Sequence, residues 1–298
     1  MFSIKNLIRF AFPALALGVV AAGAGAQTNA NPAPLSLKVV NADGNSFHVN
    51  AVVVSGKTEA VVIDSGFTRA DALRVAANVL DSGKTLKTIF ISNADPDFYF
   101  GAEVLKNMFP QAQVVTTKAV REKIEAKMAG KVAFWGPKMG ANAPRHPVLP
   151  EVLNGNTLSV DGEVIEVRGT TGELAHRPYT WIPSIKAIVG NIAIFGNLHV
   201  WTADTQKPSE RQAWFKQLDE LDALQATTVV PGHMAAGTKL DSSTIRYTRE
   251  YLQRFDVEAA KAKDGASLIK AMQTAYPNAG LGIALDIGAK VNKGEMQW

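Results

Sequence analysis

The 298-residue sequence contains no cysteine. Disulfide bonds, thiolate metal ligands and a cysteine nucleophile are therefore all excluded. The sequence also lacks a G-x-S-x-G motif around a nucleophilic serine and a glycine-rich phosphate-binding loop. A serine hydrolase of the α/β type and a nucleotide-binding enzyme are therefore not expected.

The sequence also has little net charge, since it contains 31 Lys and Arg residues and 27 Asp and Glu residues, for a formal charge of +4. No cluster of basic residues is interleaved with aromatic ones, so the sequence does not predict nucleic-acid binding. The partner that we expect is a small-molecule substrate or ligand.

Residues 1–26 have the pattern of a secretory signal peptide. Lys5 and Arg9 precede an apolar run over residues 10–22, and small residues lead up to Ala26. The run is shorter than the ~20 residues that a membrane span needs. We expect cleavage after Ala26 and a periplasmic or secreted protein with no membrane attachment, the alternative being an uncleaved anchor. Export without cysteine is typical of a domain that depends on its core alone.

The mature chain is long enough for one large domain, which we place at residues 35–298 after a disordered lead-in over residues 27–34. Alternating and continuous apolar runs predict strands at residues 36–40, 47–54, 60–63, 89–91, 114–116, 157–160, 163–167, 179–182, 187–189 and 226–230. Helical spacing predicts helices at residues 69–81, 98–109, 118–128, 210–224, 242–263 and 265–275. Residues 130–150, rich in Gly and Pro, are predicted to be a long connection that acts as a lid or binding loop.

The chemistry is concentrated in residues 88–101, TIFISNADPDFYFG. A buried strand is followed by a turn with Asp95 and Asp97, and then by a helix. Ligands often bind at this place, the carboxyl end of a strand in an α/β sheet. The alternative is that both aspartates are turn and N-cap residues.

This stretch resembles the H-x-H-x-D-H signature of the metallo-β-lactamase-fold hydrolases, which include glyoxalase-like enzymes. Asn93, Asp95, Asp97 and Phe98 stand at its H, H, D and H positions. The resemblance implies an α+β fold, a four-layer αββα sandwich. It also implies that Asp64, in VVIDSG, supports the metal-binding loop, although Asp64 could equally cap the following helix.

The resemblance places Thr170 and Asn191 at two further ligand positions and matches His233 to the last histidine of the family. Phe98 has no donor atom, and Asn93, Thr170 and Asn191 are weak neutral donors. Asp95, Asp97 and His233 remain as metal ligands, enough for one divalent ion, Zn²⁺, Mn²⁺ or Fe²⁺. A di-zinc centre is not expected.

The other histidines are weaker candidates. His199, near Trp201, is either a catalytic proton donor or substrate contact, or a packed core residue. His146 lies in the long connection, and His176 follows the Thr170 turn, where it could substitute as a ligand.

Three functions follow. The first is a divergent hydrolase of an ester, lactone or thioester, with Asp97 and His199 as catalytic residues and at most one metal. The second is a pseudoenzyme that binds a ligand or partner without turnover. The third is metal-free hydrolysis by Asp95 and Asp97 as a carboxylate pair that shares a proton.

Overall fold

The computed structural model describes residues 34–298, so the predicted signal peptide and almost all of the lead-in lie outside the described residues. The first sheet has six strands in the order β1-β2-β3-β4-β5-β6. They are β1 (Ser36–Asn41), β2 (Asn50–Ser55), β3 (Glu59–Ile63), β4 (Thr85–Ile91), β5 (Gln113–Thr116) and β6 (Glu151–Val152). The first three pair antiparallel and the last three are parallel. Continuous runs such as AVVI form the central strands because both faces of the sheet are covered.

The second half of the chain forms a five-stranded sheet in the order β12-β10-β9-β8-β7. Its strands are β7 (Thr157–Val160), β8 (Glu163–Arg168), β9 (Tyr179–Ile182), β10 (Ala187–Val189) and β12 (Thr228–Val229). A short pair, β11 (Phe195–Gly196) and β13 (His233–Met234), runs parallel beside it. Side chains of both large sheets, among them Ile63, Phe90, Ile165 and Ile182, interlock in one buried core.

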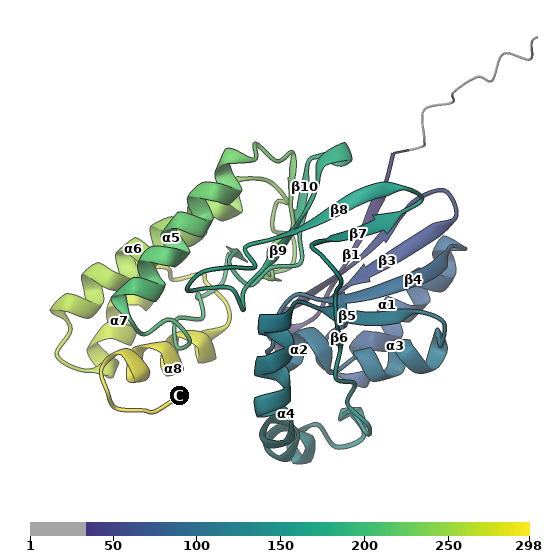
Figure 1. Cartoon of the computed structure of the whole chain (residues 1–298). Coiled ribbons are helices and arrows are strands. Elements are labelled where there is room, and N and C mark those ends of the chain that lie inside the picture. The colour runs from purple at the N-terminus through teal and green to yellow at the C-terminus, as the bar shows by residue number, and fades with distance from the viewer. Residues whose placement is uncertain (1–33) are drawn as a thin grey trace, which may run out of the picture. The chain divides into compact units, whose positions relative to one another are not determined.

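Helices cover the outer face of each sheet (Figure 1). On the first sheet lie α1 (Arg69–Ser82), α2 (Pro96–Tyr99), α3 (Ala102–Met108) and α4 (Lys118–Met139). On the second lie α5 (Pro208–Ala223), α6 (Ser243–Lys261), α7 (Gly265–Ala275) and α8 (Gly282–Asn292). The predicted αββα sandwich is therefore confirmed.

A predicted helix and a predicted strand have different bounds in the structure. The helix predicted at residues 98–109 is two helices, α2 and α3, separated at Gly101, whose Cα lies so close to Ser65 that a Cβ would be 2.0 Å from its carbonyl oxygen. The strand predicted from Phe47 begins only at Asn50, because Phe47 and His48 have φ angles of 56° and 57°.

The prediction of a long connection from residue 130 is wrong for its first part, because α4 continues to Met139. The helix tolerates Gly130 and Gly136, and Trp135 anchors it by packing edge-on against Phe67, 5.4 Å between ring centroids. The last helix predicted from the sequence covers residues 265–275, and α8, which follows it, was not expected. Among the described residues, no helix has the length and apolarity to cross a membrane.

Candidate active site

Asp64 fixes the loop that follows β4. Its carboxylate accepts hydrogen bonds from the backbone N–H and the hydroxyl of Ser92, each at 2.7 Å. Burial raises the pKa of Asp64 to about 7, opposed by these bonds from Ser92. The alternative that Asp64 caps α1 is wrong, because Thr68 does so in a capping box with Asp71. Asp64 is therefore a positioning residue for the loop.

The loop presents two carboxyl groups from a single turn of helix. Asn93 accepts a hydrogen bond from the backbone N–H of Asp95 at 2.8 Å. Asp95 stands at the N-cap position of α2, but its side chain makes no capping hydrogen bond. Asp95 lines a cavity together with Asp97.

His233, at the start of β13, faces Asp97 across this cavity. The imidazole Nε2 lies 3.5 Å from Asp97 Oδ2, and Nδ1 lies 2.9 Å from the carbonyl oxygen of Phe47. A carbonyl oxygen only accepts hydrogen bonds, so the Nδ1–H is fixed there and the Nε2 lone pair points to Asp97. Phe195 stacks on the ring at 5.2 Å and Phe98 meets its edge at 5.4 Å.

Burial controls the protonation of these groups. It lowers the pKa of His233 to about 4 and, together with the neighbouring Asp95, raises that of Asp97 well above its usual range. Burial, then the charge of Asp204, raises the pKa of Asp95 to about 6. Burial therefore favours the uncharged forms of Asp97 and His233 where they meet, and a pKa of about 6 leaves Asp95 mostly ionised at neutral pH.

Three further positions that the resemblance assigns to ligands are Phe98, Asn191 and Thr170, and the first two have structural roles. The ring of Phe98 is fully buried. The side-chain amide of Asn191 donates to the carbonyl oxygen of Val230 at 3.0 Å and accepts from the backbone N–H of Ile194 at 2.9 Å. Thr170 lies half-buried beyond the end of β8.

The donor set does not fit a catalytic zinc site as it stands. Asp97 and His233 are the two donors in contact, and Asp95 lines the same cavity. Within residues 34–298, however, no three His, Asp or Glu side chains are grouped so that they could hold a metal ion. A catalytic zinc site uses three protein ligands. The assignment of Asp95, Asp97 and His233 to one ion stays a prediction.

Three other histidines, His199, His176 and His146, do not line this cavity. His199 is buried, with Nδ1 2.9 Å from the hydroxyl oxygen of Tyr251, and burial lowers its pKa. Burial and then Lys123 lower the pKa of the half-buried His176 to about 4. His146 is exposed. A catalytic role for His199 stays a prediction, and its packing accounts for its position without one.

The cavity that contains Asp95, Asp97 and His233 has a volume of about 180 Å³ and mostly apolar walls. Three residues of these walls, Lys131, Phe134 and Trp135, lie in the stretch that the sequence predicted to be a lid or binding loop, although they belong to α4. Sequence reasoning missed the wall residues of the C-terminal segment: Leu281, Ile283, Ile287, Met296 and Trp298. The spacing of Ala284, Leu285 and Ala289, all buried in α8, was a signal for that helix.

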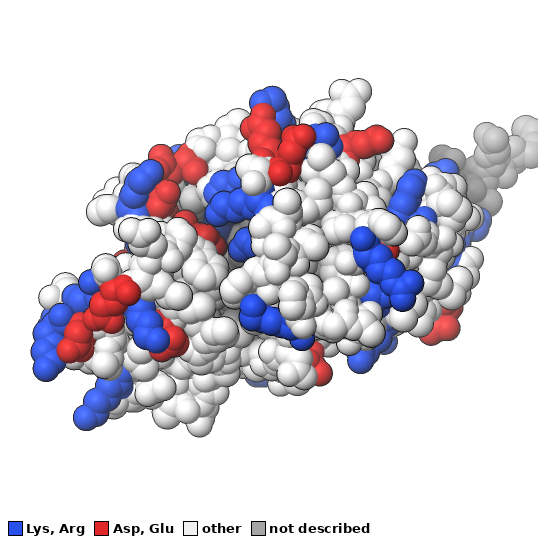
Figure 2. All heavy atoms as spheres, turned by 90° about the horizontal axis from the view of Figure 1, so that it is seen from below, with Lys and Arg blue, Asp and Glu red and all other residues white. Residues whose placement is uncertain are grey.

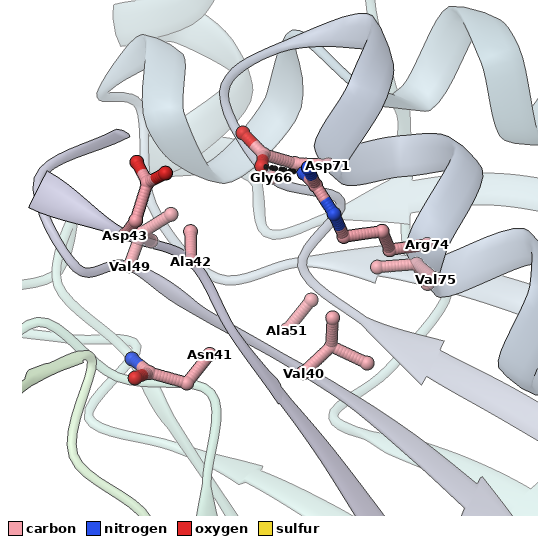
Figure 3. Close-up of a pocket in the computed structure, with 10 residues that line it drawn as sticks. All are labelled: Val40, Asn41, Ala42, Asp43, Val49, Ala51, Gly66, Asp71, Arg74 and Val75. Carbon is pink, nitrogen blue, oxygen red and sulfur yellow. Dashed lines mark hydrogen bonds and ion pairs between the residues drawn. The ribbon is translucent and has the colours of Figure 1, made fainter. Parts of the chain in front are cut away.

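A second cavity, of about 170 Å³, lies between the first two strands and the start of α1 (Figure 3). Of its two acids, Asp71 is already engaged by Thr68, by Ser46 at 2.6 Å and by Arg74 at 2.9 Å. Asp43 accepts a hydrogen bond from the backbone N–H of Asn45.

Known structures with this fold come from several bacteria. A metallo-beta-lactamase family protein of Thermus thermophilus is 17% identical, with a TM-score of 0.60 over 88% of this chain and 93% of that one. A metallo-beta-lactamase of Pontibacter korlensis is 18% identical, with a TM-score of 0.53 over 74% of this chain and 95% of that one. These identities support the fold alone. A search of curated protein sequences found no match.

The sequence itself settles the family. Residues 44–233, more than half of the chain, match the family model described as the metallo-beta-lactamase superfamily. This range includes Asp64, the loop with Asp95 and Asp97, and His233 at its end. The chain belongs to the metallo-beta-lactamase superfamily.

Proposed function

We propose that this chain is a divergent hydrolase of a small ester, lactone or thioester that holds at most one divalent ion. One observation carries the proposal. Asp95 and Asp97 come from the loop after β4, His233 comes from β13 far along the chain, and all three line one cavity. Such convergence of polar groups at the floor of an apolar cavity is typical of an active site.

The residues supply both a proton donor and a proton acceptor. The carboxyl group of Asp97, in contact with His233, is placed to give a proton to the carbonyl or leaving-group oxygen. The carboxylate of Asp95, free of any capping bond, is placed to accept a proton from an attacking water. Two carboxyl groups in unlike environments divide the roles of acid and base in this way. No step of this scheme passes through a metal ion.

Binding without turnover is a second candidate, and two observations favour it. Phe98 fills a family ligand position with a fully buried ring. Asn191 fills another, and its amide is committed to two backbone groups. A chain that has lost metal ligands while keeping its fold and pocket is what a binding protein of this family would look like.

Hydrolysis assays with ester, thioester and lactone panels distinguish the two. We expect turnover by the wild type, and losses of about 100-fold or more in kcat for Asp97→Asn and Asp95→Asn. Asp81→Asn, an exposed acid of α1, is the matched control and should be unaffected. If no substrate class is hydrolysed, or if both variants match the control, the hydrolase is excluded and the binding protein remains.

We also propose export to the periplasm, on the basis of the charged, apolar and small-residue pattern of residues 1–26. The intact mass of protein from a periplasmic fraction should correspond to a chain that begins at Gln27. A mature chain that still contains Met1 would contradict export by cleavage.

A further inference from the structure

The mouth of the cavity gathers exposed apolar side chains. Phe134, Ile283, Met296 and Trp298 are between 40% and 54% exposed, and all four line this one cavity. They come from two segments far apart in the chain, α4 and the residues from Leu281 onward. An exposed apolar patch continuous with a cavity marks a place where an apolar group binds.

The cavity has room for such a group. Its volume of about 180 Å³ exceeds the about 150 Å³ of an apolar cavity that takes up benzene. Phe195, Ile192 and Trp135 form apolar walls beyond the mouth. A short alkyl chain or an aromatic ring therefore fits between the mouth and the Asp97–His233 pair.

Unpaired positive charges lie beside this mouth. Lys131 lines the cavity, with Nζ 5.3 Å from the centre of the Trp298 ring. Lys127 and Lys123 precede it by four and eight residues, so the three lysines share one face of α4. None of them has a carboxylate partner within ion-pair distance in the part of the chain that the structure describes. Figure 2 shows blue side chains along the middle of the face seen from below, between wide white areas.

Two acids lie among these positive charges, Asp95 in the cavity and Asp204 beside its mouth. The two carboxylate oxygens of Asp204 accept hydrogen bonds from the indole N–H groups of Trp201, at 2.7 Å, and Trp298, at 3.1 Å. Asp204 thereby links Trp201 to Trp298 at the mouth. The charges of Asp204 and Asp95 both act on Arg177 and Lys123. The three lysines and Arg177 outnumber these two acids, so net positive charge is left for an anionic ligand.

Arg177 adds a buried positive charge behind the cavity wall. It is 3% exposed, and its guanidinium lies 4.1 Å from the ring centre of Trp214. Nη2 donates to the carbonyl oxygen of Ile192, a lining residue, at 3.3 Å, whereas Nη1 is buried without a partner among the described residues. The charges of Asp204 and Asp95 act on Arg177 without forming an ion pair with it, so this buried guanidinium is compensated only in part.

From this arrangement we infer that the cavity binds a small amphiphilic anion, with its apolar group inside and its carboxylate or phosphate at the mouth beside Lys131 and Lys127. That such an anion is also the substrate rests on the proposed hydrolysis. The substrate would then be an ester or thioester that carries both an apolar group and an anionic group. The binding itself does not depend on turnover.

A pair of probes isolates the charge. Octanoate and octanamide differ in charge but share the alkyl chain, and binding is followed by the fluorescence of Trp135, Trp201 and Trp298, which line the cavity. We expect octanoate to bind more tightly than octanamide. Lys131→Gln should weaken octanoate by about tenfold and leave octanamide unchanged. Lys118→Gln, on another face of the same helix and paired with Glu122, is the matched control.

A second pair of variants isolates the apolar contact. Ile283→Asn should weaken octanoate and octanamide equally, whereas Leu80→Asn, an exposed residue of α1 away from the cavity, should change neither. Equal affinity for both probes in the wild type, or equal effects of Lys131→Gln and Lys118→Gln, would overturn the inference. Binding to phosphatidylglycerol vesicles but not to octanoate would also overturn it, because the patch would then be a membrane-binding face.

These outcomes are separate from those of the hydrolysis assay. Charge-selective binding with no turnover leaves this inference intact and removes the hydrolase. Turnover of neutral and anionic esters at the same rate, unaffected by Lys131→Gln, keeps the hydrolase and removes the anion site.

Discussion

The Nε2 atom of His233 lies 3.5 Å from Oδ2 of Asp97, and burial shifts the pKa values of the two groups in opposite directions, lowering one to about 4 and raising the other well above its usual range. Burial favours the uncharged form of each group, and the carbonyl of Phe47 holds the imidazole in the tautomer whose Nε2 lone pair faces Asp97.

The first prediction concerns the pH dependence of stability. In the folded state Asp64 keeps its proton up to about pH 7, whereas an unfolded aspartate loses it near ~3.9. The contribution of protonated Asp64 to the free energy of unfolding is therefore full below pH ~3.9. This contribution is lost as the pH rises through about 7. Asp64→Asn keeps an acceptor for Ser92 and tolerates the φ angle of 62°. The free energy of unfolding of Asp64→Asn, relative to that of the wild type, should rise across this pH window by on the order of 4 kcal/mol at most. Urea unfolding at several pH values measures this, and parallel curves would contradict it.

Metal removal should leave the fold unchanged. Two donors in contact bind an ion weakly, and their positions are fixed by protein groups such as the Phe47 carbonyl. Dialysis against a chelator should therefore not lower the melting temperature, and elemental analysis should give no more than one divalent ion per chain. A fall that zinc reverses in the wild type, but not in His233→Ala or Asp95→Asn, would instead establish the three-ligand site.

β-Lactam hydrolysis should be absent. Phe98 and Asn93 stand where the family signature has imidazoles, and the Phe98 ring is fully buried against His233. Steady-state assays with a carbapenem and a cephalosporin in added zinc should give no measurable turnover. A kcat of ~1 s⁻¹ or more would show that a functional metal centre is present.

Two glycine substitutions should have opposite effects. In Gly232→Ala the new Cβ would lie 1.9 Å from the carbonyl oxygen of Asn191, so a loss of more than about 2 kcal/mol is expected. Gly130→Ala, in an open position of α4, should stabilise the chain by up to about 1 kcal/mol. Thermal unfolding of both variants gives the comparison. A neutral Gly232→Ala would mean that the two loops can separate without cost.

The sandwich and the main strands could be predicted because long apolar runs and the loop signature are local features of the sequence. The break at Gly101 could not, since it depends on the approach of Ser65, which is distant in the chain. The length of α4 was hidden by Gly130 and Gly136, whose cost Trp135 offsets through tertiary packing.

The residues of the site could likewise be predicted only in part. The register of the motif pointed to Asp95, Asp97 and His233, and the structure places all three at one cavity. The tautomer of His233 depends on the carbonyl of Phe47, a backbone atom that no residue pattern reveals. The walls formed by Ile283 and Trp298 required knowing that the C-terminal segment folds back on α4.

Asn191 connects two loops that lie beside the site. Its side-chain amide joins the backbone at Val230 to that at Ile194, and its backbone carbonyl oxygen lies against Gly232. An aspartate at this position would lose the donated bond and place a buried charge without a counter-ion. A single Asn191→Asp substitution should therefore lower the free energy of unfolding, so the loops around β11 and β13 depend on the neutral amide at this position.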